Sequence, residues 1–433
     1  MEENQGKFTQ DFRAMINIVF WNGLGMFFLE FIILYFCNQV LHASATDIGM
    51  LVSVQILGYS ISSPIAGALT DKISKKKLVL LGSFGRATAY LIIYAGIILK
   101  TLWIMGCGTF SIGFGAGFFW VSLDTLLSEK SNKKNRTQAY GMRMAAVGRG
   151  QLLGSVIGFT IFGFAQGNNL SPFLLFSPIL LYSMANFYAG FKFRNKVDDK
   201  IKFVNEETSN SEEKISSTLT LKKNWIYGIL FLYLVILLSN FNGSLAKPFI
   251  QIYLMEFITQ NTDLILAAYF CNGILTTILA PKLGKIIDKI RPEWGISLAS
   301  IAGALFTLLL LQTYNFYLFT FLMIIDFTIA SVAGLSIQNI LSRISERNRG
   351  KIFGFQNLMG NIGSILGPVL GGILWDSFRP QTPFIVSIYI ELALIPFFLL
   401  AIKSISPYLA EKIEEKKSIS NQENQFQTDL AKE

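Results

Sequence analysis

Long apolar runs alternate with short polar segments along the whole chain. Most of these runs reach about 20 residues, the length that an α-helix needs to cross the hydrocarbon core of a bilayer. The predicted fold class is therefore an all-α membrane protein. The pattern predicts twelve transmembrane helices, over residues 14–37, 47–69, 78–99, 103–126, 138–164, 172–192, 225–250, 262–283, 294–312, 316–341, 352–376 and 382–403.

The longest polar interruption lies between the sixth and seventh runs and divides them into two sets of six. Its charged, Ser- and Asn-rich composition is typical of a flexible linker. We expect five parts: an N-terminal segment (1–13), an N-terminal six-helix bundle (14–192), a linker (193–224), a C-terminal six-helix bundle (225–403) and a tail (404–433).

One polar loop occurs twice. The second run ends in G-A-L-T-D-K at 67–72, and the eighth ends in G-K-I-I-D-K at 284–289, which is 217 residues later (284 − 67). The glycines of the fifth run at 150, 154 and 158 recur 213 residues later (363 − 150) in the eleventh. Repetition at about half the chain length indicates two pseudo-symmetric six-helix bundles.

The composition agrees with a membrane protein, because 52% of the residues are hydrophobic and the mean hydropathy is +0.47. The net charge of +9 does not indicate a nucleic-acid partner, because the basic residues cluster in the loops on one side of the predicted helices. The positive-inside rule assigns that side to the cytoplasm. We expect a multi-pass protein of the plasma or inner membrane, with the N-terminal segment, the linker and the tail in the cytoplasm.

The sequence predicts neither a metal site nor a cofactor. Three cysteines and a single histidine suggest no disulfide framework and no metal cluster. A G-x-x-x-x-G-K-[ST] phosphate loop and a plausible catalytic triad are both missing. We therefore expect a secondary transporter rather than an enzyme or an ATP-driven pump.

The duplicated loop and the twelve-span layout resemble the major facilitator superfamily, in which the second span is followed by G-x-x-x-D-[RK]-x-G-[RK]-[RK]. Ser74 replaces the second glycine of this pattern. The matching residues of the first copy are Gly67, Asp71, Lys72, Lys75 and Lys76. The second copy has Gly284, Asp288 and Lys289, with Arg291 in place of the glycine.

The resemblance implies a cytoplasmic gate and a monomer. Asp71 would dock at the start of the eleventh span and Asp288 at the start of the fifth, closing the cytoplasmic side while the outside is open. In the competing interpretation, the lysines at 72–77 only anchor the loop on the cytoplasmic side.

Small residues at intervals of three or four predict close helix packing in the fifth and eleventh spans. The fifth span lacks the G-P-x-x-G-G that the family's proton antiporters tend to carry, which argues against drug/proton antiport. The predicted packing residues are Gly150, Gly154, Gly158, Gly363, Gly367, Pro368, Gly371 and Gly372.

Ionisable residues inside apolar spans are costly and are candidates for function. Glu30 and Lys247 occupy equivalent places in the first and seventh spans, 217 residues apart (247 − 30), and could form an outer gate pair or bind substrate charge. Alternatively, Lys247 snorkels to the interface and Glu30 is satisfied by a neighbour or by water.

Three further charges lie near the middle of their spans. Arg149, between two glycines, could bind a carboxylate or phosphate of a substrate, or could pair with Asp124 or Asp326. Asp326 could carry a coupling proton. Glu391 lies in the twelfth span, which is usually peripheral in the family.

Uncharged polar residues form stripes at helical spacing that suit a wet cavity around a polar ligand. Contacts between helices would explain the same stripes. The candidates are Gln55 and Tyr59 in the second span, Asn240 in the seventh, and Asn357 and Asn361 in the eleventh.

We expect transport of a small solute by alternating access, with the lipid bilayer and a coupling ion such as the proton as further partners. One hypothesis is uptake or exchange of a polar or anionic metabolite, by symport or antiport, with Arg149 and the Asn and Gln stripes binding it. The other is proton-coupled efflux of lipophilic or cationic compounds, with Glu30 and Asp326 as charge sites. A receptor that resembles a transporter but moves nothing is a third, different class.

Overall fold

The structure is a computed structural model that describes residues 8–132, 135–201, 223–287, 292–344 and 349–405. The chain forms two compact units. Unit 1 comprises Met1–Glu213, Pro248–Gly273 and Pro368–Ser377, and unit 2 comprises Lys214–Lys247, Ile274–Gly367 and Phe378–Glu433. Three helices of the second half therefore pass from one unit to the other, next to Pro248, Gly273 and Pro368.

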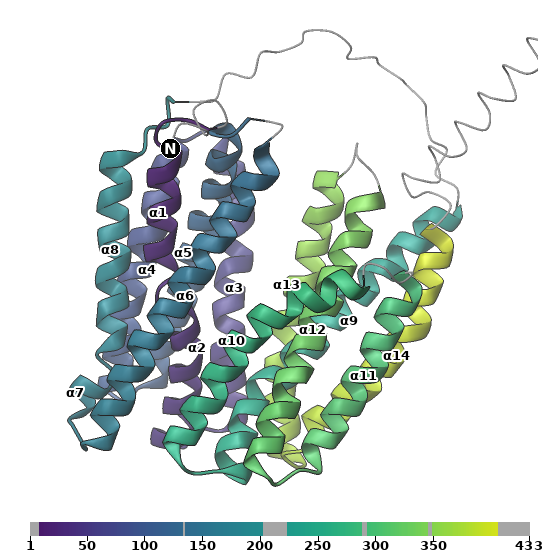
Figure 1. Ribbon diagram of the computed structural model, residues 1–433. Coiled ribbons are helices and arrows are strands. Elements are labelled where there is room, and N and C mark those ends of the chain that lie inside the picture. Colours follow the sequence, from purple (N-terminus) through teal and green to yellow (C-terminus); the bar gives the residue numbers. More distant parts are fainter. Residues whose placement is uncertain (1–7, 133–134, 202–222, 288–291, 345–348, 406–433) are drawn as a thin grey trace, which may run out of the picture. The chain divides into compact units, whose positions relative to one another are not determined.

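Helices occupy all six predicted spans of the first half, with breaks inside the first span and between Leu175 and Pro178 in the sixth (Figure 1). The first span is divided, because the helix is interrupted between Gly23 and Met26 and ends in a π-helical turn. The elements are α1 (Phe12–Gly23), α2 (Met26–Tyr35), η1 (Phe36–Val40), α3 (Ala45–Thr70), α4 (Lys75–Ile98), α5 (Leu102–Glu129), α6 (Arg136–Gly167), α7 (Pro172–Leu175) and α8 (Pro178–Lys196).

The second half repeats this plan, and its predicted spans also lie on helices. Nine helices within the described ranges are long and apolar enough to cross a membrane. The all-α membrane fold is therefore confirmed. The elements are α9 (Lys223–Tyr253), η3 (Leu254–Ile258), α10 (Thr262–Ile287), α11 (Pro292–Leu311), α12 (Phe316–Ile344), α13 (Arg349–Ser377) and α14 (Thr382–Ile405).

Local sequence explains where several helices begin. The hydroxyl of Ser44 accepts the N–H of Asp47 at 3.1 Å, and that of Ser74 accepts the N–H of Lys77 at 3.3 Å. Each serine thus supplies an acceptor for a first-turn N–H group that has no partner inside the helix. The helices α7 and α8 begin with proline, whose missing N–H is not needed there.

Glycines on two faces of α5 bring neighbouring helices into backbone contact. A Cβ atom at Gly113 would collide with the carbonyl oxygen of Gln55 in α3. On the other face, a Cβ at Gly108 would lie 2.9 Å from the backbone nitrogen of Ile93 in α4. Such contacts add van der Waals attraction between helices in lipid, where the hydrophobic effect is weak. They hold α3, α4 and α5 together within unit 1.

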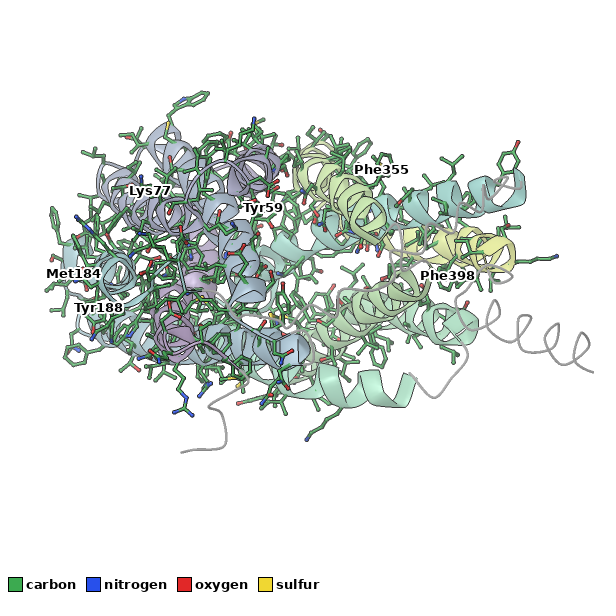
Figure 2. The ribbon with its side chains drawn as sticks, turned by 90° about the horizontal axis from the view of Figure 1, so that it is seen from above. Tyr59, Lys77, Met184, Tyr188, Phe355 and Phe398 are labelled. Carbon is green, nitrogen blue, oxygen red and sulfur yellow. The ribbon has the colours of Figure 1, made fainter. Side chains whose placement is uncertain are left out.

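Large apolar side chains cover the outside of the helices. Trp103 is 86% exposed and Met184 is 67% exposed. Figure 2 shows Met184 and Tyr188 of α8 at the outer edge of unit 1. Because large apolar surfaces are unfavourable in water, these faces fit the hydrocarbon of a bilayer.

Candidate functional site

Arg86 of α4 is a positive charge held inside unit 1. Its side chain is almost fully buried, and Nη2 donates a hydrogen bond to the carbonyl oxygen of Asn22 at 3.0 Å. That carbonyl is available because α1 ends at the next residue, where the last carbonyls lack helical partners. The guanidinium carbon also lies 5.6 Å from the ring centre of Phe119 and 5.8 Å from that of Trp120. The charge of Arg86 is therefore stabilised by a carbonyl and by aromatic faces.

An ion pair joins α5 to α6. The Nε atom of Arg143 lies 3.0 Å from Oδ1 of Asp124 in an ion pair whose angle is not that of a hydrogen bond. The guanidinium of Arg143 also lies 4.9 Å from the ring of Trp120, one turn before Asp124 on α5. Tyr59 of α3, labelled in Figure 2, is close enough to interact electrostatically with both charges. Both side chains remain partly exposed, so this cluster combines charge with aromatic surface.

Unit 2 contains two acidic side chains that we call the acidic pair, Asp326 of α12 and Glu391 of α14. The hydroxyl of Thr307 in α11 donates to Oδ1 of Asp326 at 3.0 Å. One turn earlier on α11, a Cβ at Gly303 would lie 2.9 Å from both carboxylate oxygens of Glu391. Glu391 interacts electrostatically with Asp326. The helix α11 thus brings both carboxyl groups together.

The acidic pair has no cationic partner within the described residues. Neither carboxylate forms an ion pair there, and Oε2 of Glu391 is buried without a hydrogen-bond partner among them. Sequence reasoning placed Glu391 in a peripheral span and did not connect it with Asp326. The signal it could have used is Gly303, which leaves room for a large side chain from a neighbouring helix.

The other predicted substrate residues are spread over both units. Arg149 of α6 is exposed, and its Nε donates to the carbonyl oxygen of Ala145 at 3.1 Å. Glu30 is an exposed residue of unit 1, whereas Lys247 belongs to unit 2, where its ammonium lies 5.9 Å from the ring of Phe327. Their proposed pairing therefore stays a prediction. Gln55 is exposed on α3.

The polar stripe of unit 2 involves α9 and α13. Asn240 donates from Nδ2 to the carbonyl oxygen of Ile236 at 2.8 Å, and its amide lies against Gly360. Asn357 is exposed and Asn361 is half-buried. These amides can take part in ligand binding or in helix packing, so their role stays a prediction.

The packing glycines lie where the helices approach closely. A Cβ at Gly154 would be 2.8 Å from the backbone of Leu24, and one at Gly363 would be 2.8 Å from the backbone nitrogen of Phe241. A side chain at any of these positions would meet backbone or ring atoms. A Cβ atom would also collide with neighbouring atoms at Gly150, Gly158, Gly367 and Gly372. The remaining two packing residues, Pro368 and Gly371, are buried.

The first copy of the loop motif connects α3 to α4. Asp71 and Lys72, directly after α3, are exposed, and Gly67 lies in its last turn. Lys75 forms an ion pair with Glu129 at the end of α5, with an N···O distance of 3.2 Å. In the second copy Gly284 lies in α10, whereas Asp288, Lys289 and Arg291 lie outside the described residues.

Asp199, which follows α8, holds the start of α4. Its Oδ1 accepts the N–H of Lys76 at 3.0 Å, and its other oxygen accepts the hydroxyl of Ser74. A carboxylate at a helix N-terminus is favoured by the helix dipole. The motif loop is therefore fixed to the beginning of the predicted linker.

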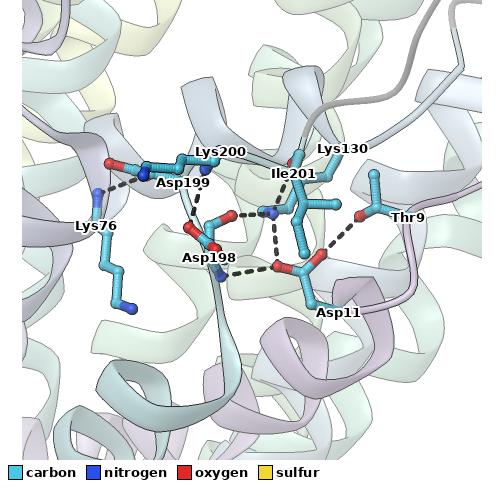
Figure 3. A network of polar contacts seen from close by, with 8 residues as sticks. All are labelled: Thr9, Asp11, Lys76, Lys130, Asp198, Asp199, Lys200 and Ile201. Carbon is cyan, nitrogen blue, oxygen red and sulfur yellow. Dashed lines mark hydrogen bonds and ion pairs between the residues drawn. The ribbon is translucent and has the colours of Figure 1, made fainter.

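A buried lysine next to this contact joins three segments (Figure 3). Lys130, at the end of α5, donates to Oδ2 of Asp11 at 2.6 Å and to the carbonyl oxygens of Asp198 and Ile201 at 2.6 and 2.9 Å. Asp11 also accepts the hydroxyl of Thr9 at 2.8 Å. The N-terminal segment, the end of α5 and the segment after α8 are thus tied together.

Comparison with known proteins identifies relatives along most of the chain. It is 23% identical over 343 residues to multidrug resistance protein 2 of Bacillus subtilis, covering 78% of this chain and 82% of that protein. It is 24% identical over 360 residues to the quinolone resistance protein NorA of Staphylococcus aureus, covering 81% of this chain and 86% of that protein.

Solved structures share the fold. A bacterial homologue of the human lysosomal transporter Spinster, in an inward-facing conformation, matches with a TM-score of 0.68 at 11% identity, over 92% of this chain and 95% of that one. The nucleoside transporter NupG matches with a TM-score of 0.67 at 12% identity, over 91% and 99%. The family model of the Major Facilitator Superfamily matches residues 15–336 and 232–428. Because these two matches account for both halves of the chain, this protein belongs to the major facilitator superfamily of membrane transporters.

Proposed function

We propose that this protein exports lipophilic cations from the cytoplasm in exchange for protons, by alternating access. The observation that carries this proposal is the acidic pair, Asp326 and Glu391, inside unit 2. Two neighbouring carboxylates in an apolar environment repel each other, and a proton or a bound cation relieves that repulsion. If the two compete for the same carboxylates, then release of the cation is coupled to uptake of a proton.

The partners of the charged side chains favour a cationic substrate over an anionic one. In unit 1, Arg86 is stabilised by a carbonyl and two rings, and Arg143 is paired with Asp124. Arg143 thus has an anionic partner, and Arg86 is held by a carbonyl and two rings although its Nη1 has no hydrogen-bond partner among the described residues. The acidic pair is not matched by a cation in the described residues. The aromatic ring of Tyr59 suits a lipophilic cation. The names of the relatives, multidrug and quinolone resistance proteins, agree with such cargo and weigh against the missing antiporter motif of the fifth span.

Import or exchange of a polar or anionic metabolite is the second candidate. The exposed guanidinium of Arg149 favours it, since this group has five N–H donors for a carboxylate or phosphate. In both cases we propose that the loop motif and both termini face the cytoplasm, because the basic loops lie on that side.

Flux measurements in proteoliposomes test the proposal. With an imposed pH gradient, tetraphenylphosphonium should accumulate on the side with the higher proton concentration, and the variant Asp326→Asn should lose this uphill accumulation. Exchange of labelled for unlabelled tetraphenylphosphonium without a gradient should continue in the variant at a reduced rate, because Glu391 still offers a carboxylate to the cation and exchange needs no net proton movement. The control is Asp263→Asn, which neutralises an exposed acid at the start of α10.

Two results would contradict the proposal. One is uphill accumulation by Asp326→Asn at the rate of the unmodified protein. The other is transport of organic anions that is lost in Arg149→Gln, with no transport of tetraphenylphosphonium. The second result would establish the anionic candidate instead.

A further inference from the structure

Asp376, in the last turn of α13, binds the first turn of α3. Its Oδ1 accepts the N–H of Ala45 at 3.1 Å. Its Oδ2 accepts the N–H of Thr46 at 2.8 Å and the hydroxyl of Thr46 at 2.6 Å. A carboxylate in this position interacts favourably with the helix dipole and makes charge-assisted hydrogen bonds. All three residues belong to unit 1, although Asp376 comes from the second half of the chain.

The first turn of α3 depends on this distant residue. Its own cap, Ser44, accepts only the N–H of Asp47. The corresponding helix of the second half is α10, whose start is capped locally: Asn261 accepts the N–H groups of Asp263 at 2.9 Å and Leu264 at 3.3 Å. The two matching helices therefore differ: α3 is capped in part by a residue of the other half of the chain, whereas α10 is capped by its own neighbour Asn261.

The surrounding contacts show that α3 and α13 lie in direct contact here. A Cβ at Gly372 would be 2.6 Å from the Cα of Thr46, and one at Gly49 would collide with the carbonyl of Pro368. Two further bonds at the same end of unit 1 join residues of different halves. The amide of Gln166 donates to the hydroxyl of Thr262 at 2.8 Å, and that of Asn38 donates to the carboxylate of Glu256 at 2.6 Å.

We propose that Asp376 is a latch that closes the outer end of the transporter and releases when that end opens. The proposal rests on the proposed alternating access and on the orientation with a cytoplasmic loop motif. That motif lies at the opposite end of α3, so the turn held by Asp376 is at the outer end. Opening this end requires α3 and α13 to separate, and the three hydrogen bonds of Asp376 must then break.

The latch has a counterpart at the other end of the same helix. Asp71 follows the last residue of α3 and is exposed here. The family resemblance implies that it docks at the start of α13 when the cytoplasmic side closes. The helices α3 and α13 would then carry one carboxylate latch at each end.

Distance measurements between spin labels test the proposal without any substrate. The labels are placed at His42→Cys and Ser377→Cys, two exposed positions at this end, with the native Cys37, Cys107 and Cys271 replaced by alanine. Asp376→Asn should raise the ratio of the long-distance to the short-distance population roughly tenfold, because the charge-assisted bonds are weakened. Thr46→Val removes only the hydroxyl donor and should produce a smaller shift in the same direction.

The control Asp263→Asn changes an exposed acid of the same end and should leave the distances unchanged. Identical distance distributions for the unmodified protein and Asp376→Asn would overturn the latch. A shift of equal size in Asp263→Asn would also overturn it, because the effect would then be one of surface charge. If the distances shift as expected and tetraphenylphosphonium is not transported, the proposed substrate fails and the latch stands.

Discussion

Lys130 shows how a single residue organises one end of unit 1. Its ammonium group is fully buried, and its three donors are used by the carboxylate of Asp11 and the carbonyls of Asp198 and Ile201. Removing one partner of such a pair leaves the other charge buried and uncompensated. The contribution of Lys130 therefore lies in joining three segments that are distant in sequence.

We predict that Lys130→Met lowers the stability of the protein by about 3 kcal/mol, because the Asp11 carboxylate loses its ion-pair partner while the apolar stem is largely kept. Thermal unfolding in mild detergent, followed by intrinsic fluorescence, measures the change. The matched control is Lys196→Met, which alters an exposed lysine in the last turn of α8. Equal unfolding temperatures for the two variants would show that the buried network does not stabilise unit 1.

The ion pair of Asp124 and Arg143 shows which part of the site the sequence predicts. The sequence gives the helix on which each charge lies, but not which charges pair. The spacing of residues places Arg143 and Arg149 on the same helix and shows that both are unusual in an apolar span. Which of them faces Asp124 depends on the rotation of α6 against α5, and hydrophobic periodicity along one helix carries no information about that rotation. For the same reason the proximity of Asp326 to Glu391, mediated by α11, was missed.

At the scale of elements, the glycine faces of α5 determine how three helices pack. Gly113 and Gly117 face α3, and Gly108 and Gly115 face α4. The many glycines of this span are a sequence signal for tight packing or bending. It could not assign each glycine to a partner, because both neighbours are apolar along their length.

We predict that Gly113→Ala destabilises the protein by about 1–3 kcal/mol, because the new methyl group collides with the carbonyl oxygen of Gln55 and forces α3 and α5 apart. The control is Gly148→Ala in α6, where a Cβ would have no other atom within 4 Å. This change should be neutral or stabilising by up to about 1 kcal/mol, since alanine favours the helix. Unfolding temperatures that change equally in both variants would contradict the packing role.

For the whole molecule, the apolar runs predicted the fold class and most helix ends to within a few residues. The run at 382–403 corresponds to α14 (Thr382–Ile405), and the run at 47–69 corresponds to α3 (Ala45–Thr70). The interruption between Gly23 and Met26 was not predicted, because the sequence there is as apolar as the rest of the span. The division of α9, α10 and α13 between two units depends on contacts distant in sequence, which no local pattern reports.

The two latches on α3 lead to a prediction about the balance between conformations. A transporter that alternates between two states needs similar free energies for both, so each latch must be offset by the other. If Asp71 engages only when the cytoplasmic side is closed, Asp71→Asn should favour the state with a closed outer end. Its effect on the spin-label distances at the outer end is therefore opposite to that of Asp376→Asn.

Combining Asp71→Asn with Asp376→Asn should return the populations close to those of the unmodified protein, within roughly threefold in their ratio. The control for the inner end is Lys77→Gln, which removes an exposed charge of the same loop and should leave the distances unchanged. If both aspartate variants shifted the distances in the same direction, the carboxylates would stabilise one state together and could not alternate. Opposite shifts that cancel would mean that the two carboxylates stabilise opposite states by similar free energies. The transporter could then pass between both states without being held in either.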